Sequence, residues 1–218
     1  MQAIMESLFD AAYLLFAFFT GGRLLGRSGG QGRLWGWMVL LLGAGDAFHL
    51  IPRVMKYWLP GEYAAALGIG TLATSITMTV FYLLLEYARR QRYRVSGQKG
   101  VLCILWALTL ARILLCLMPQ NQWTAPNAPA IWGIYRNIPL VAMGAMTVGL
   151  WFASARRDGP FHLMWLAVLL SFIFYLPVVL WADVLPIIGM LMLPKTCMYI
   201  WMLVMFTRGV KEPARLAS

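Results

Sequence analysis

The stretch GAGDAFHLIPR, residues 43–53, places an acid, an imidazole and a guanidinium within a run of apolar residues. Asp46, His49 and Arg53 are spaced i, i+3 and i+7, so in a helix they share one face. A carboxylate beside a histidine orients the ring and favours its use as a general base. An arginine holds a phosphate or a carboxylate through paired hydrogen bonds. We therefore expect this face to point into the protein and to form part of a polar site.

Other polar and ionisable residues interrupt apolar segments elsewhere in the chain. Such residues are rare in membrane-spanning segments because burying them in hydrocarbon is costly, so each one is a functional candidate. Asp46 and His49 are the candidate catalytic residues. Glu6 and Asp183 add negative charge. The candidate ligand-binding residues are Asp10, Asp46, His49, Arg53, Arg112, Tyr135, Arg136, Asn137, Tyr175, Lys195 and Tyr199.

The composition requires a membrane environment for the elements that carry these residues. The 218-residue chain is 61% hydrophobic and 12% charged, with a mean hydropathy of +0.71. A bilayer core is crossed by about 20 apolar residues in a helix, which satisfies every backbone polar group internally. We therefore predict an all-α, single-domain bundle over residues 1–218. Its seven transmembrane helices are expected at about 4–22, 34–55, 63–87, 101–118, 130–152, 162–182 and 186–207.

The basic residues alternate between the links that join these segments. Most of the 18 Lys and Arg residues lie in the links 21–33, 87–99 and 153–161 and in the C-terminal tail. This is the positive-inside pattern of multi-pass proteins of the cytoplasmic (inner) membrane. It predicts an external N-terminus and a cytoplasmic C-terminus, and it argues against nucleic acid as the reason for the net charge of +10.

This orientation places all the candidate residues in the outer half of the membrane. The inner half contains little beyond Glu86 and His162. We therefore expect an outward-facing polar cavity centred on Asp46, His49, Arg112, Arg136 and Lys195. Pro52, Pro139, Pro177 and Pro194 are expected to kink four of the helices and to widen this cavity. The small residues Ala66, Gly70 and Thr74 are expected to allow close helix packing.

Two functions are consistent with such a cavity. The first is binding of an anionic or zwitterionic small molecule, or of a membrane-lipid headgroup, by a receptor-like or transporter-like protein. The second is intramembrane lipid hydrolysis or group transfer. There His49 would act as a base oriented by Asp46, with Arg112, Arg136 or Lys195 stabilising an oxyanion or a phosphate. For these two functions we expect neither a metal nor another cofactor. A zinc hydrolase is disfavoured because the two histidines are predicted at opposite faces of the membrane.

A third hypothesis starts from Lys195. Seven helices, an external N-terminus and a mid-membrane lysine in the last helix are similar in outline to the microbial rhodopsins, and FIFYLPVVLW (172–181) resembles their aromatic and proline wall around retinal. The resemblance implies that Lys195 carries retinal. Asp46 would be the counter-ion, because segment 63–87 has no mid-membrane carboxylate. Leu191 stands where the ion-pumping rhodopsins have an aspartate four residues before the lysine.

Overall fold

The computed structural model describes residues 2–27, 29–125, 128–182 and 184–212, and every regular element in these ranges is a helix. Seven are α-helices, and two short 3₁₀ helices, Pro119–Asn121 and Pro186–Leu191, lie in the connections. Asp183 lies outside the described residues. The α-helices are α1 (Gln2–Leu25), α2 (Gly30–Trp58), α3 (Ala64–Tyr93), α4 (Lys99–Leu117), α5 (Ala130–Ala155), α6 (Met164–Trp181) and α7 (Met192–Gly209).

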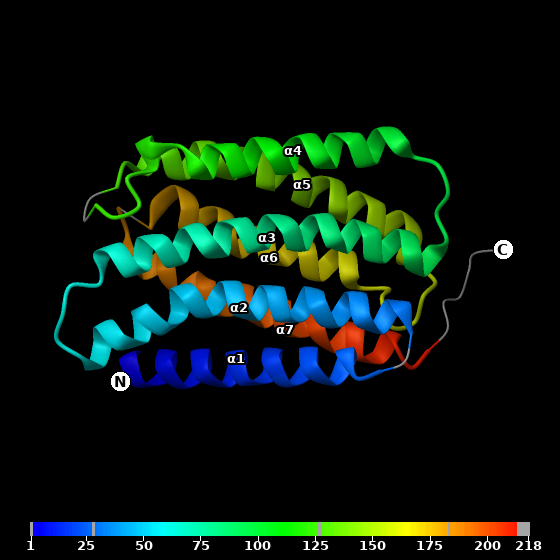
Figure 1. Ribbon diagram of the computed structural model, residues 1–218, viewed down its shortest axis with the longest axis horizontal. Coiled ribbons are helices and arrows are strands. Elements are labelled where there is room, and N and C mark those ends of the chain that lie inside the picture. The colour runs from blue at the N-terminus through cyan, green and yellow to red at the C-terminus, as the bar shows by residue number, and fades with distance from the viewer. Residues whose placement is uncertain (1, 28, 126–127, 183, 213–218) are drawn as a thin grey trace.

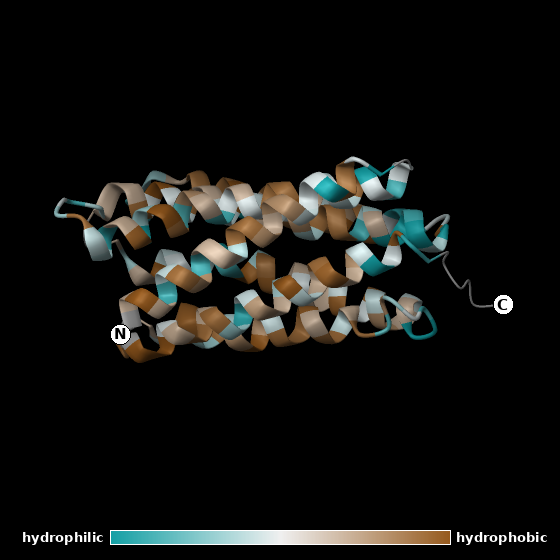
Figure 2. Ribbon diagram, turned by 90° about the horizontal axis from the view of Figure 1, so that it is seen from below, coloured by the Kyte–Doolittle hydropathy of each residue, from teal (hydrophilic) through white to brown (hydrophobic). Residues whose placement is uncertain are grey.

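All seven helices are long and apolar enough to cross a membrane, counting the 3₁₀ turn before α7 as part of the last span. Their outward faces carry large apolar side chains, such as those of Leu8, Leu15 and Ile187, which are at least 70% exposed. Figure 2 shows apolar residues along most of the bundle and hydrophilic residues gathered toward the end opposite the N-terminus. The predicted multi-pass, all-α fold is confirmed. The direction in which the chain crosses the membrane stays a prediction.

The helices run nearly parallel to the long axis of the molecule (Figure 1). Each helix packs against the next one in the chain, and α7 also contacts α1. Helices α1, α3, α5 and α7 begin at one end of the bundle, which we call the site end. Helices α2, α4 and α6 begin at the other end, which we call the basic end. The positive-inside pattern predicts that the basic end is cytoplasmic.

Helices α2 and α3 approach each other closely because small residues face the partner backbone. A Cβ atom added to Gly70 would lie 2.2 Å from the carbonyl oxygen of Phe48 and 2.8 Å from the Cα of His49. Thr74, one turn further along α3, donates a hydrogen bond of 2.8 Å to the carbonyl oxygen of Gly45. The small-residue ridge of α3 therefore packs against α2, as its spacing predicted.

The last membrane-spanning segment differs from the expectation for residues 186–207. It opens with the 3₁₀ turn Pro186–Leu191, and the α-helix begins only at Met192. Pro194 is consequently in the first turn of α7, where a missing N–H breaks no intrahelical hydrogen bond. Pro52, Pro139 and Pro177 do lie inside α2, α5 and α6. The expected kink at Pro194 is replaced by a change of helix type before it.

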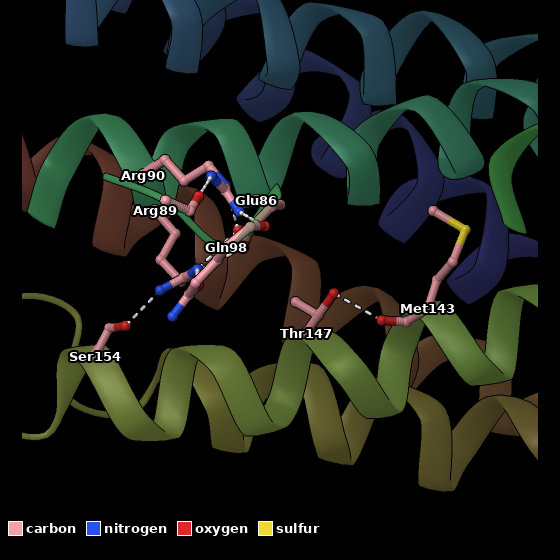
Figure 3. Close-up of polar contacts among 8 residues, drawn as sticks. Glu86, Arg89, Arg90, Gln98, Met143, Thr147 and Ser154 are labelled. Atoms are coloured by element: carbon pink, nitrogen blue, oxygen red, sulfur yellow. Dashed lines mark hydrogen bonds and ion pairs between the residues drawn. The ribbon is translucent and has the colours of Figure 1, made fainter. Parts of the chain in front are cut away.

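Helix α3 continues six residues beyond its predicted end at residue 87 because its arginines are neutralised within the bundle. Glu86, 1% exposed, accepts hydrogen bonds from Arg89 at 2.7 and 2.8 Å and from Arg90 at 2.7 Å. Arg89 also reaches Ser154 on α5 (Figure 3). Arg92 pairs with buried Asp158 at 3.0 and 3.1 Å. The sequence placed these arginines in an exposed link at 87–99, whereas the structure buries Arg89 and Arg92 in ion pairs at the basic end.

Candidate functional site

Two adjoining cavities lie among the helices in the half of the bundle nearer the site end. The first, of about 50 Å³, is lined by residues of α1, α2, α3 and α7 and of the turn before α7. The second, of about 90 Å³, extends from α2, α3 and α7 to α4, α5 and α6. His49, Thr74, Met192 and Lys195 line both cavities. These four residues therefore form the boundary between the two spaces.

The cavities differ in the charge of their linings. Three carboxylates, those of Glu6, Asp10 and Asp46, face the first cavity together with the cations Arg53 and Lys195. The described lining of the second cavity contains the cations Arg112 and Lys195, the hydroxyls of Thr71, Thr74 and Ser75, and no carboxylate. Lys195 is thus placed between a space of mixed charge and a space whose described lining is cationic and neutral.

Hydrogen bonds between α1 and α2 hold the acidic side of the first cavity. Arg53 donates to the carboxylate of Glu6 at 2.7 Å, and the hydroxyl of Tyr57 donates to the same oxygen at 2.9 Å. One turn or more deeper, the hydroxyl of Tyr13 donates to Asp46 at 2.6 Å. Glu6 is 3% exposed, so this pairing keeps its charge from being buried alone. The face carrying Asp46, His49 and Arg53 points into the bundle, as their spacing predicted.

Asp46 and His49 do not form the pair expected of a base and its orienting carboxylate. Asp46 accepts its hydrogen bond from Tyr13 on α1, whereas Nδ1 of His49 lies 3.1 Å from the hydroxyl of Thr71 on α3. Residues three apart in a helix diverge by about 60° around its axis, so each side chain reaches a different neighbouring helix. The hydroxyl of Thr71 also lies 2.8 Å from the carbonyl oxygen of Leu67, which accepts its proton. In that arrangement Nδ1 of His49 donates to Thr71, and Nε2 carries the lone pair.

Lys195 is 5% exposed and has aromatic neighbours in place of a counter-ion. Its ammonium nitrogen lies 4.3 Å from the ring centre of Tyr175 and 5.5 Å from that of Tyr199. Among the described residues no carboxylate lies within ion-pair distance of it. Ring faces attract a cation through their quadrupole, and this attraction is stronger where water is excluded. The ammonium is therefore held at the boundary of the cavities and remains directed toward them.

Arg112 is the second buried cation that lines the cavities; it is 1% exposed and joins four helices. Its guanidinium donates to the hydroxyl of Thr79 on α3 at 2.9 Å, to the side-chain oxygen of Asn137 on α5 at 2.9 Å, and to the backbone carbonyl of Arg136. Tyr175 on α6 donates to the same oxygen of Asn137 at 2.8 Å. Each of these acceptors is neutral, so the positive charge of Arg112 is not cancelled by the groups that orient it.

Arg136 and Tyr135 lie outside the cavities that the structure describes. Arg136 donates to the side-chain oxygen of Asn121 at 2.9 Å and lies 4.4 Å from the ring centre of Trp123, so it holds the α4–α5 connection. Tyr135 is 45% exposed and packs edge-on against Trp132. Eight of the predicted residues line at least one cavity, and Asn137 supports Arg112 from behind it. The eight are Asp10, Asp46, His49, Arg53, Arg112, Tyr175, Lys195 and Tyr199.

The sequence interpretation missed the hydroxyl groups of α3 as cavity residues. Thr71, Thr74 and Ser75 all line the second cavity. The segment was interpreted as a packing ridge, and Gly70 with Thr74 does serve that role. The available signal was the spacing i, i+3 and i+4 of three hydroxyl residues, which places them on one side of the helix.

The geometry also tests the fit of a retinal or a metal ion. The cavities beside Lys195, of about 50 and 90 Å³, are smaller than the roughly 300–1,000 Å³ of pockets for drug-sized ligands. The described space beside Lys195 is therefore smaller than a chromophore of retinal's length needs. Among the described residues no group of three His, Cys, Asp or Glu side chains is arranged to hold a metal ion.

Comparisons of the chain with protein-family models, with curated proteins and with solved structures found no match.

Proposed function

We propose that this protein binds a small anionic or zwitterionic molecule in the two cavities, in a receptor-like or transporter-like role. The observation that carries the proposal is the second cavity, where Arg112 and Lys195 face a space with hydroxyl groups and no carboxylate among its described lining residues. A carboxylate or phosphate oxygen placed there would meet two cations and the hydroxyl of Ser75, and charge-assisted hydrogen bonds are the strongest type.

The first cavity supports a zwitterion over a simple anion. An ammonium group placed there would lie near Asp10 and Asp46, while the anionic end of the same molecule would reach Lys195 and Arg112. The two spaces together are small, which favours a molecule the size of an amino acid or of a phospholipid headgroup. The site end, through which such a ligand would enter, is the end that the positive-inside pattern predicts to be external.

Lipid hydrolysis or group transfer has less support. That hypothesis depends on a base oriented by its carboxylate, and Asp46 bonds to Tyr13 instead of His49. Thr71 is the hydroxyl within reach of the His49 ring, at 3.1 Å, and its own hydrogen bond to Leu67 commits its proton to the helix backbone.

The test compares Lys195→Met with Lys56→Met, which removes the same charge from an exposed position of α2. Thermal unfolding of the detergent-solubilised protein would be followed with glycine, glutamate, inorganic phosphate or phosphoethanolamine as probes. A probe at 100 times its dissociation constant stabilises the folded state by about 2.7 kcal/mol. We expect one or more probes to stabilise the wild type and Lys56→Met, and none to stabilise Lys195→Met.

Two results would count against the proposal. One is equal stabilisation of Lys195→Met and the wild type, and the other is a wild type that responds to none of the four probes. Uptake of the stabilising probe into proteoliposomes then separates transport, where the probe accumulates inside, from reception, where it binds without crossing.

A further inference from the structure

A separate groove lies between α1 and α7 near the basic end, with a volume of about 250 Å³. It is larger than either cavity at the site end, and no residue that lines it belongs to them. Three cations border the groove: Arg23 and Lys211 are exposed, and Arg27 is half-buried. Its described lining contains no carboxylate, and the three cationic side chains form no hydrogen bond or ion pair with other described residues.

Along both walls of the groove, the lining residues change from apolar to hydroxyl to cationic toward the basic end. On the α1 side the lining passes from Phe16 and Phe19 through Thr20 to Arg23 and Arg27, with buried Leu24 between the two arginines in the chain. Phe16, Thr20 and Arg23 are spaced i, i+4 and i+7, so they form one stripe along α1, and Arg27 follows just beyond the end of this helix at Leu25. The hydroxyl residue of this stripe, Thr20, is 3% exposed, so it lies at the back of the groove and not on the outer surface.

The α7 side repeats that order with Val204 and Thr207, three residues apart on the helix, and then Lys211, just beyond the end of α7 at Gly209. The apolar part of the groove opens toward the membrane, because Phe19 at its edge is 69% exposed on a membrane-spanning helix. The groove therefore has an apolar layer, a hydroxyl layer and a cationic layer, in the order that matches a phospholipid placed upright in a leaflet. Its acyl chains, its glycerol esters and its phosphate would each meet the complementary layer.

We propose that this groove binds one anionic phospholipid from the leaflet at the basic end, with its phosphate held by Arg23, Arg27 and Lys211. Basic residues close to the membrane surface attract anionic lipids, and each contributes about 1 kcal/mol, or roughly a fivefold gain in binding. A zwitterionic lipid gains less, because its own cationic group faces the three basic side chains. The site therefore selects for net negative charge and is independent of the function proposed for the cavities.

The test uses the full chain in nanodiscs of equimolar phosphatidylcholine and phosphatidylglycerol, with retained lipid measured by native mass spectrometry. The groove variant is Arg23→Gln/Arg27→Gln/Lys211→Gln. The matched control, Arg33→Gln/Lys99→Gln/Arg157→Gln, removes the same charge from exposed residues at the same end that do not line the groove.

We expect the wild type and the control to retain one phosphatidylglycerol in preference to phosphatidylcholine. The groove variant should lose that preference by about tenfold or more, given the contribution of each basic residue. Thr207→Phe, which fills the groove and keeps all three cations, should lose it as well, so the result does not depend on the stability of the triple variant.

An equal loss in the groove variant and the control would overturn the proposal, because it would reduce the effect to the general positive charge of this end. Retention of the lipid by Thr207→Phe would also overturn it. So would displacement of the lipid by millimolar glycerol 3-phosphate in the aqueous phase, since this result would assign the groove to a soluble anion. None of these outcomes bears on Lys195, so the two proposals fail separately.

Discussion

Replacement of Gly70 by alanine should separate α2 from α3 and disturb the boundary between the cavities. The new Cβ atom would lie 2.2 Å from the carbonyl oxygen of Phe48 and 2.8 Å from the Cα of His49, where ordinary contacts begin at 3.4 Å. Both neighbours are backbone atoms, so no side-chain rotation relieves the overlap and the helices must move apart by more than an ångström. Overpacking of this kind typically costs about 1–3 kcal/mol, and a backbone clash lies toward the upper value.

Gly149→Ala on α5 is the matched control, because a Cβ atom there meets nothing within 4 Å. Both changes gain the same helix propensity, about 0.5–1 kcal/mol for alanine over glycine within a helix. Thermal unfolding in detergent should therefore show Gly149→Ala at or above the wild type and Gly70→Ala below it. The shift is expected to be about 2–4 °C for each kcal/mol in a protein of this length.

A loss of ligand stabilisation should accompany the loss of stability in Gly70→Ala, because His49 borders both cavities and lies directly against the added methyl group. If Gly70→Ala were as stable as Gly149→Ala, the close approach of α2 and α3 would not exist as described. His49 and Thr74 would then not form the boundary between the two cavities.

Two further changes test the buried polar contacts at each end of the bundle. Asp158→Ala leaves Arg92 buried without its carboxylate, which should lower the free energy of unfolding by about 3–5 kcal/mol in thermal or denaturant unfolding. The double variant Arg92→Met/Asp158→Ala should recover most of that loss. A double variant as unstable as the single one would contradict the buried ion pair. Asn137→Leu removes the acceptor shared by Arg112 and Tyr175, which should cost about 1–3 kcal/mol. It should also weaken binding of the stabilising probe, and unchanged affinity would show that Arg112 does not depend on Asn137 for its position.

Hydropathy along the chain was sufficient to predict the seven helices. A membrane-spanning helix must be about 20 residues long and mostly apolar. Each segment can be judged by this requirement without knowledge of the rest of the chain. The boundaries were less well predicted where charges are neutralised by partners. The arginines of α3 were placed in a link at 87–99, yet Arg92 lies in the helix because Asp158, 66 residues away in the chain, accepts its hydrogen bonds.

For the polar site, the sequence predicted the depth of the residues but not their partners. The alternation of the helices places Asp46, His49, Arg112 and Lys195 in the same half of the bundle, and counting residues along each segment was enough to show it. Depth does not show which neighbour a side chain meets. Arg136 has the depth of the site, but it turns to the α4–α5 connection and stacks on Trp123.

The amino-acid sequence by itself determined that the chain has seven segments long and apolar enough to cross a membrane, and that the charged residues of the cavities lie in one half of the bundle. Both properties follow from the hydropathy of each contiguous segment and from the position of each residue along it. Only the tertiary structure decided that Tyr13 bonds to Asp46, that Thr71 lies at the His49 ring, and that Lys195 faces aromatic rings. Hydrogen bonds require atoms within about 3 Å, and one residue of helical rotation, about 100°, turns a side chain toward another helix. The partners therefore depend on how the helices are rotated and packed together, which no single segment specifies.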